Sequence, residues 1–418
     1  MADVAGIGAI GRVLKIANYR NYTAGNFASQ LGMWVQRIAV AWLTWTLTES
    51  PLWLGIMAMA DFMPNLVFAP LAGALADRLD RLKAIRFYMV ISACLSGAIA
   101  ALTISGLITV HILLVLVLLN GIAMSFNYPV RLSIIHALVG HESLTTAISI
   151  NAIVFNIARI GGPALSGQMI SHLGIGSAVA FTVVADLVFV VMLFLVTLAP
   201  KTEAATKPSA KNLSAEIMEG FRYVASHKGI GPLLFVLAFY SIFGRTFIEL
   251  FPAFSDEIFG KGADGLAMLT SVLGVGSLFG SLFLARIQGV AGLTRILIFN
   301  VLLSSIAVIG FAATNMYAAA LFCTFVVGIA IVMIGVIEQT LLQASVDGAM
   351  RGRVLSFYTL IARGCPSLGA LLLGWLATHF GLQLPVAAGA VACIGLWFWA
   401  FHRRESLSRY LEVTPDDK

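Results

Sequence analysis

The sequence predicts an all-α membrane protein with twelve transmembrane helices in two pseudo-symmetric six-helix bundles. Three observations support this fold class. The 418 residues are 59% hydrophobic and only 11% charged, whereas a soluble protein would carry about 25% charged residues. Apolar runs close to the ~20 residues that cross a bilayer recur about twelve times along the chain. Most of the 26 Lys and Arg residues fall in alternate connecting segments, as in a polytopic membrane protein.

The expected transmembrane helices follow the apolar runs in order. In the first half of the chain they cover 23–47, 52–76, 85–107, 112–135, 147–172 and 177–199. In the second half they cover 230–251, 266–286, 296–314, 316–342, 354–379 and 384–401. These helices define an N-terminal bundle (23–199) and a C-terminal bundle (230–402).

Three polar segments remain, and basic residues collect in each of them. They are an N-terminal segment (1–22), a linker with an amphipathic stretch around 217–224 (200–229) and a C-terminal tail (403–418). Because Lys and Arg accumulate on the cytoplasmic side of membrane proteins, both termini and the linker are expected in the cytoplasm. This placement also accounts for the net charge of +6 without a nucleic-acid partner.

The composition argues against an enzyme. Neither a nucleophile–base pair nor a metal-ligand spacing stands out, and no soluble domain is evident that could hold an active site. We therefore expect no enzymatic activity, no bound metal and no cofactor. The expected partners are a small-molecule substrate and the lipid bilayer, and the chain is expected to be a monomer in a bacterial inner membrane.

Two motifs stand out against the apolar background. The run from Gly73 to Lys83 places Asp77 and Arg78 in a short charged turn between two spans. A second run, 158–167, lies in the middle of the fifth span and is echoed by 362–369 in the eleventh. Its small residues allow close helix approach and its proline permits a kink. Parallel repeats of this kind predict a substrate site between the two halves, near the bilayer midplane.

With these motifs the chain resembles the major facilitator superfamily along nearly its whole length. The run 73–83 is similar to that family's loop between the second and third helices, although Asp80 replaces the usual glycine. The counterpart in the second half has Ala285 in place of the acid. Within the superfamily, the nearest group contains the enterobactin exporter and macrolide-efflux proteins. That comparison rests on 48–50, Pro64, 70–73, Gln343, Asp347, 351–354 and Pro366.

The resemblance also implies a gating role for one set of residues. In this family the acid that corresponds to Asp77 holds one conformation by contacting the start of the eleventh helix, and a carboxylate at a helix N-terminus is favoured by the helix dipole. The fifth-helix run is similar to a motif associated with antiporters. The alternatives are an ordinary basic loop and plain helix packing. The gating candidates are Gly73, Asp77, Arg78, Arg81, Arg159, Gly161, Gly162, Pro163, Gly167 and Arg363.

Ionisable residues inside the expected spans are the strongest clue to a site, because burying them in a bilayer is costly. Arg37 and Asp61 lie at matched depths on consecutive helices and are expected neighbours. Asp61 and Glu338 are the first candidates for a carboxylate that changes protonation during transport, Glu249 is the third, and Arg37 could switch Asp61. A permanent salt bridge is the alternative for Asp61 and for Glu338. The eight residues are Arg37, Asp61, Arg159, Asp186, Arg245, Glu249, Glu338 and Arg363.

Three of these residues have expected roles of their own. Arg245 and Glu249 stand one helical turn apart and could pair locally. Asp186 is expected to be structural, because the sixth helix is peripheral in the fold that the resemblance implies.

Helical spacing predicts a polar cavity. Asn26, Gln30 and Arg37 share one face of the first helix, and a polar row with Arg131 at its end shares one face of the fourth. In the implied fold the first, fourth, seventh and tenth helices line the central cavity. A mixed polar and aromatic lining suits an amphipathic molecule better than a sugar. The cavity candidates are Asn26, Gln30, Arg37, Asn120, Met124, Asn127, Tyr240, Phe247, Phe251 and Glu338.

Together these features predict a secondary active transporter. We expect export of amphipathic small molecules, such as drugs or siderophore-like metabolites, by alternating access and with a proton gradient as the energy source. One alternative is a lipid or lysolipid flippase of the same fold, which would need a lateral opening and a less polar cavity. Another is a non-transporting membrane sensor, which usually carries an added soluble domain.

Overall fold

The computed structural model describes residues 7–76, 79–198, 213–287, 289–348 and 350–412. These residues are almost all helical and contain no β-strand. Eleven helical stretches among them are long and apolar enough to cross a membrane. The protein is therefore an all-α integral membrane protein, as predicted. The one predicted span that is missing from these eleven is the first, 23–47, which lies in α2 (Ala17–Thr48). This helix is long enough but carries polar side chains such as Gln30 and Arg37, so the number twelve stays a prediction.

The chain forms two compact units. Unit 1 contains Met1–Glu49, Ala60–Ala205 and Lys261–Ser271, and unit 2 contains Ser50–Met59, Thr206–Gly260 and Val272–Lys418. Two helices, α3 (Pro51–Ala76) and α10 (Gly262–Leu284), contribute to both units.

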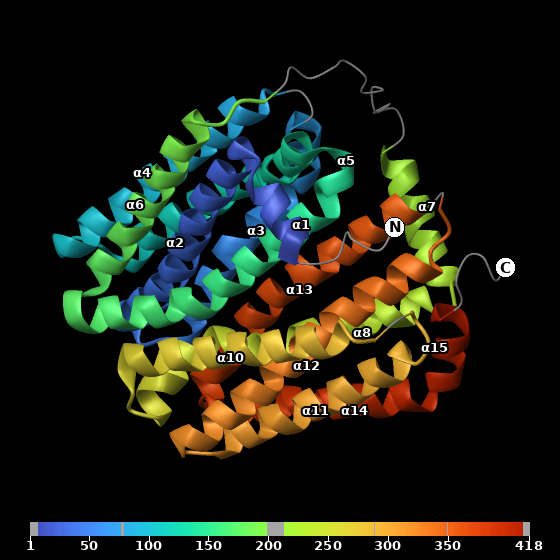
Figure 1. Ribbon diagram of the computed structural model, residues 1–418. Helices are drawn as coiled ribbons and strands as arrows, with labels where there is room; N and C mark the ends of the chain where they lie inside the picture. The colour runs from blue at the N-terminus through green and yellow to red at the C-terminus, as the bar shows by residue number, and fades with distance from the viewer. Residues whose placement is uncertain (1–6, 77–78, 199–212, 288, 349, 413–418) are drawn as a thin grey trace. The chain divides into compact units, whose positions relative to one another are not determined.

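Unit 1 is a bundle of four long helices with the short α1 (Ile7–Leu14) beside it. The four are α2, α4 (Arg81–Ile104), α5 (Val110–Leu173) and α6 (Ile175–Phe194). They pack side by side (Figure 1) around a core that contains Tyr22, Ile85 and Phe189. Asp80 caps the start of α4, because its Oδ1 accepts a hydrogen bond of 3.0 Å from the backbone N–H of Lys83.

The helix α5 contains both the fourth and the fifth predicted span. Its 64 residues are helical throughout except at Gly140, which has φ 69° and ψ 173°. A positive φ is strained for residues with a Cβ, so glycine allows the chain to change direction there without a separate loop. The sequence predicted a connecting segment of about ten residues at this place, because the apolar pattern is interrupted there.

Unit 2 is built from the second half of the chain. The helix α8 (Ile230–Phe243) packs against α13 (Arg351–Phe380), and α11 (Leu293–Ala313) packs against α12 (Tyr317–Ser345) and α14 (Gln383–His402) (Figure 1). The amphipathic stretch predicted in the linker lies within α7 (Leu213–Ser226), where Glu219 forms an ion pair of 2.8 Å with Arg353 of α13. The α-helices confined to this unit are α7 (Leu213–Ser226), α8 (Ile230–Phe243), α9 (Phe251–Ala253), α11 (Leu293–Ala313), α12 (Tyr317–Ser345), α13 (Arg351–Phe380), α14 (Gln383–His402) and α15 (Arg404–Leu411).

The seventh predicted helix is broken rather than continuous. The helix α8 ends at Phe243, and the chain continues as a 3₁₀ turn η2 (Thr246–Leu250), the single turn α9 and a π turn η3 (Phe254–Ile258). Gly244 lies directly against the ring of Tyr240, where a Cβ would not fit. Pro252 has no N–H to donate to the preceding turn. The predicted span 230–251 lies within the stretch Ile230–Ile258, which is long and apolar enough to cross a membrane, but it is not one regular α-helix.

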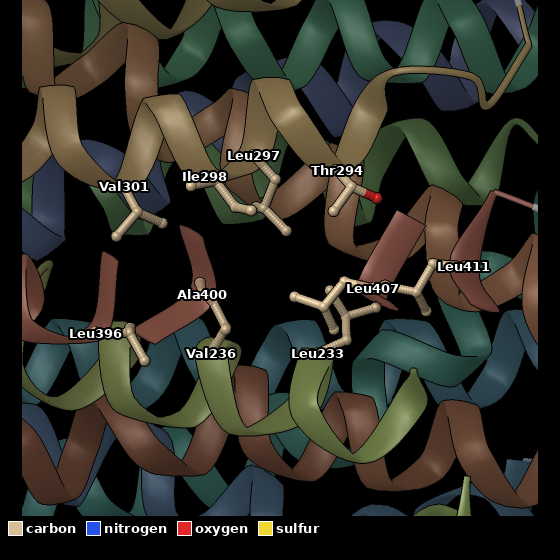
Figure 2. A pocket seen from close by; sticks show the side chains of 10 residues that line it. All are labelled: Leu233, Val236, Thr294, Leu297, Ile298, Val301, Leu396, Ala400, Leu407 and Leu411. Atoms are coloured by element: carbon tan, nitrogen blue, oxygen red, sulfur yellow. The ribbon is translucent and has the colours of Figure 1, made fainter. Parts of the chain in front are cut away.

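The tail beyond the last membrane helix folds back onto unit 2. Leu407 and Leu411 of α15 lie between α8 and α11 and are fully buried (Figure 2). The cavity left at this place is about 10 Å³, which is at most the space of one water molecule. This apolar seam therefore anchors the tail and has no room for a ligand.

Glu412 fixes the end of the same tail. Its carboxylate accepts hydrogen bonds from the backbone N–H groups of Gly292 at 2.9 Å and Thr294 at 2.8 Å, and from the hydroxyl of Ser408 at 2.9 Å. Burial by itself raises the pKa of this carboxyl, but the hydrogen bonds from Gly292 and Thr294 outweigh it and hold the pKa below its usual range. Glu412 thus caps the N-terminus of α11 from a distant part of the chain.

Candidate functional site: two buried carboxylates

Asp186 of α6 is the buried carboxylate of unit 1. Its side chain is 3% exposed, and both of its oxygens accept hydrogen bonds. Ser29 of α2 donates to Oδ1 at 3.0 Å, and Ser92 of α4 donates to Oδ2 at 2.9 Å. Two hydroxyl donors favour the ionised form of the carboxylate, while burial opposes it.

Arg131 of α5 is the cation that belongs to this carboxylate. It donates through Nη2 to the hydroxyl oxygen of Ser29 at 2.9 Å and through Nη1 to Oδ1 of Asn26 at 2.9 Å. Its guanidinium carbon also lies 4.9 Å from the ring centre of Phe189. The hydrogen-bonded path from Arg131 to Asp186 therefore passes through the Ser29 hydroxyl.

The same network extends to the second part of α5. Asn26 donates through Nδ2 to Oδ1 of Asn151 at 2.9 Å. The chain of hydrogen bonds thus connects α6, α4, α2 and both parts of α5, and all of these helices lie in unit 1. Buried networks of this kind are costly to break, because removing one member leaves another buried polar or charged group without its partner.

Sequence reasoning found only part of this network. Asn26 was predicted as a cavity residue, and Arg131 was placed only at the end of the polar row on the fourth helix. Asp186 was expected to be structural, and nothing distinguished Ser29 or Ser92 from other serines. One available signal was the spacing of Asn26 and Ser29, which places both on one face of α2.

Glu338 of α12 is the buried carboxylate of unit 2, and its surroundings are different. It is 1% exposed, and among the described residues neither of its carboxylate oxygens has a hydrogen-bond partner. Arg245 acts on it electrostatically. The two nearby tyrosines point their hydroxyls elsewhere: Tyr240 bonds to Ser304 at 2.6 Å, and Tyr358 donates to the carbonyl of Gly335 at 3.3 Å.

The other predicted coupling residues lie on α2, on α3 and in the 3₁₀ turn. Arg37 is half-buried on α2, with its guanidinium carbon 4.9 Å from the ring centre of Phe62 on α3. Phe62 adjoins Asp61, so α2 and α3 bring the two predicted partners into one neighbourhood, while a bond between them stays a prediction. Glu249 is half-buried in the 3₁₀ turn, so the α-helical spacing used to pair it with Arg245 does not apply there.

The predicted cavity residues divide into two groups. Asn26 and Asn127 are buried within the unit 1 bundle, where Asn127 contacts the sulfur of Met89 at 3.2 Å. Tyr240, Phe247 and Phe251 are buried in unit 2, where both phenylalanines pack against Phe311. The structure gives these side chains packing contacts, and their role in a cavity stays a prediction. Glu338 is buried in unit 2 as described above, and four further members are half-buried: Gln30, Arg37, Asn120 and Met124.

The predicted gating residues are described only in part. Asp77 and Arg78 lie outside the described residues, and so do the surroundings of Gly73. Gly162 lies against Trp34 of α2, and Gly167 lies against Ala267 of α10, in both cases with no room for a Cβ.

The fifth-helix run therefore allows α5 to approach two neighbours closely, which fits helix packing as well as gating. Arg81, Arg159, Gly161 and Arg363 are half-buried, and Pro163 is buried.

An open apolar groove lies on unit 1 between α4 and α5. It has a volume of about 360 Å³, and Leu95, Leu119 and Phe126 are among the residues that line it. Its lining contains no charged residue. The groove is therefore separate from the two carboxylates.

The fold defines the class of protein. The structure is similar to a bacterial homologue of the human lysosomal transporter Spinster in an inward-facing, unoccupied conformation. The TM-score is 0.68, with 17% sequence identity over 98% of this chain and 100% of the other. The helices and this likeness identify an integral membrane protein of the major facilitator fold, as the sequence motifs predicted.

The family follows from the sequence itself. Residues 13–406 match the model of the transmembrane secretion effector family of major facilitator transporters, so the chain belongs to that family. It is 22% identical to the staphyloferrin A transporter of Staphylococcus aureus, covering 92% of this chain and 96% of the relative. It is 21% identical to macrolide efflux protein A of Streptococcus pyogenes, covering 86% and 89%. It is 25% identical to the enterobactin exporter of Shigella flexneri, covering 85% and 80%.

These matches confirm the resemblance to the exporter group that the sequence indicated. The chain is a membrane transporter and not an enzyme, and transporters of its family act on small molecules within the lipid bilayer.

Proposed function

We propose that this transporter exports amphipathic small molecules, such as drugs or siderophore-like metabolites, in exchange for protons by alternating access. The names of two relatives, a macrolide efflux protein and an enterobactin exporter, support export as the direction. We place the chain as a monomer in a bacterial inner membrane. Both termini lie in the cytoplasm in this proposal, because the basic residues collect on that side.

The observation that carries the proposal is the environment of Glu338. An ionised carboxylate that is buried without hydrogen-bond donors is very costly in a bilayer. We therefore take Glu338 to hold a proton in this conformation. A second conformation that admits water or brings Arg245 closer would favour loss of the proton. Uptake in one conformation and release in the other is what exchange of substrate for a proton requires.

The test is proton movement in sealed proteoliposomes that contain a pH-sensitive dye. A macrolide, enterobactin and staphyloferrin A are added in turn under an imposed proton gradient. At least one of them should trigger proton movement with the wild-type protein. Glu338→Gln, which keeps the shape of the side chain but cannot ionise, should reduce that movement to the level of empty vesicles.

The matched control is Glu257→Gln, the same chemical change at an exposed carboxylate of unit 2. It should leave the proton movement at the wild-type rate. Equal rates for Glu338→Gln and wild type would remove Glu338 from the coupling step. Movement of a labelled phospholipid, with no compound moving protons, would favour the flippase alternative instead.

A further inference from the structure

We infer that Asp186 is a second protonation site, and that its protonation releases Arg131 through the hydroxyl of Ser29. Asp186 would then be a positioning residue that controls where the Arg131 guanidinium points. This goes beyond the proposed function, because it concerns the other unit of the chain and holds whether or not Glu338 exchanges protons.

The hydrogen-bond donors explain why the two groups are linked. The Ser29 hydroxyl has one hydrogen, which it donates to Asp186, and its oxygen accepts from Arg131. Ser92 also donates to Asp186. When Asp186 is an anion it can only accept, so both hydroxyls then point their hydrogens at the carboxylate.

Adding a proton to Asp186 changes two things for Arg131. The carboxylate loses its charge, so the guanidinium remains in the membrane interior without a balancing anion, which is unfavourable. In addition, a proton on Oδ1 makes Asp186 a donor toward Ser29, so the Ser29 hydroxyl turns its hydrogen away from the acid. Its oxygen keeps a lone pair for Arg131, but the hydroxyl is no longer polarised by an anion and therefore accepts more weakly. Both changes weaken the hold on Arg131, which can then turn toward water or toward an anionic group. The proton comes from water and returns to water when Asp186 ionises again.

Among the described residues, few other charged or titratable groups come from the helices around this network. The helices packed against α6 are α2, α4 and α5. The group from α2 is Tyr22, which lies close enough to Arg131 to interact with it electrostatically. The group from α4 is Arg86, which is engaged elsewhere: it donates to the carbonyl of Leu193 at 2.6 Å and lies 4.3 Å from the ring centre of Phe194. The group from α5 is Arg131 itself.

Two serines provide a matched pair of variants. Ser29 and Ser92 each donate one hydrogen bond of similar length to Asp186. Of the two, Ser29 is the one that also accepts from Arg131. Ser29→Ala should therefore uncouple the arginine from the acid, whereas Ser92→Ala should change only how readily Asp186 takes up a proton.

The experiment is an infrared pH titration of the full-length protein in proteoliposomes, without substrate and without a gradient. The arginines carry an isotope label in the guanidinium group. As the pH falls, we expect a protonated-carboxyl band that is missing in Asp186→Asn and still present in Glu338→Gln. We expect a guanidinium band change with the same midpoint that is missing in Arg131→Lys.

The serine variants then decide the mechanism. In Ser29→Ala the guanidinium change should lose most of its amplitude, and in Ser92→Ala it should keep its amplitude with a shifted midpoint. Equal guanidinium changes in the two serine variants would overturn the proposal. So would the absence of an Asp186 band across the pH range in which the protein stays folded. Neither readout uses transport, so a failure of proton coupling at Glu338 would be seen separately in the proteoliposome assay.

Discussion

Asp186 and Glu338 are both buried carboxylates of membrane helices, but their immediate surroundings differ. Asp186 in unit 1 accepts two hydroxyl hydrogen bonds and is linked to Arg131 through Ser29. Glu338 in unit 2 is just as buried, but within the described residues its oxygens have no hydrogen-bond donor. The hydrogen bonds at Asp186 suit an anion, whereas the surroundings of Glu338 suit a neutral acid.

This difference shows that burial alone does not determine what a membrane carboxylate does. A carboxylate with donors stabilises the folded state as an anion, so replacing it is costly whether or not it also takes up protons. A carboxylate without donors contributes little to stability, so its presence calls for a functional explanation. Stability measurements on variants of the two sites can therefore test this distinction.

The largest difference should appear when each acid is replaced by leucine. Asp186→Leu leaves Arg131 buried without its carboxylate and should lower the free energy of unfolding by roughly 3–5 kcal/mol. Glu338→Leu removes a carboxyl group that accepts no hydrogen bond from the described residues. It should change the free energy of unfolding by less than about 1 kcal/mol, or stabilise the protein. Thermal unfolding in detergent, followed by tryptophan fluorescence, measures both.

A double variant checks the physical reason. Asp186→Leu combined with Arg131→Met removes both charges and should recover much of the lost stability. Similar losses for Asp186→Leu and Glu338→Leu would contradict the distinction between the two sites.

The two serines of the Asp186 site should differ by a smaller amount. Ser29→Ala breaks hydrogen bonds to two charged groups and should cost about 3 kcal/mol. Ser92→Ala breaks one and should cost about half as much. The same thermal unfolding assay is suitable, and a larger loss for Ser92→Ala would argue that Arg131 does not depend on Ser29.

The smallest effect is expected at Glu412, a carboxylate at the end of the tail rather than in a span. Its pKa is held below the usual range by hydrogen bonds that outweigh burial. Its contribution to stability is therefore complete above the ordinary glutamate pKa of about 4.3 and is lost as the pH falls through the lower folded-state pKa. Because the group is partly exposed, Glu412→Gln should cost less than about 1 kcal/mol at neutral pH.

Hydrogen exchange at the first backbone amides of α11, measured across a pH series, detects this effect. Exchange at Thr294 should be faster in Glu412→Gln than in wild type at neutral pH, and the two should converge in acid. Glu405→Gln, an exposed change on the same short helix, is the control and should behave like wild type. If the difference in exchange rate between Glu412→Gln and wild type grew as the pH fell, the expected direction of the pH dependence would be wrong.

The sequence predicted the fold class well because membrane helices leave a strong local signal. Each span is a run of apolar residues, and the loop motif around Asp77 identified the superfamily. The irregular places were missed for equally local reasons. Gly140 and Gly244 resemble the many other glycines of the chain in sequence. The positive φ of Gly140 shows that the helix changes direction there, and the contact of Gly244 with Tyr240 accompanies the end of α8.

The site was harder to predict because it depends on which helix faces meet. Glu338 was recognised as a coupling candidate, since a lone acid in an apolar span is conspicuous. The network of Asp186 was not, because Ser29, Ser92 and Arg131 come from three helices that are far apart in the sequence. Glu412 shows the same limitation, since its partner Thr294 is 118 residues away.

The single-residue junction at Gly140 has a consequence for how this protein can evolve. Arg131 and Asn151 lie on opposite sides of that junction, and both bond to Asn26. Each residue added to a helix turns the remainder of that helix by about 100°, so one inserted residue would rotate Asn151 away from Asn26. Relatives can therefore exchange side chains in this stretch, but insertions and deletions should be rare there.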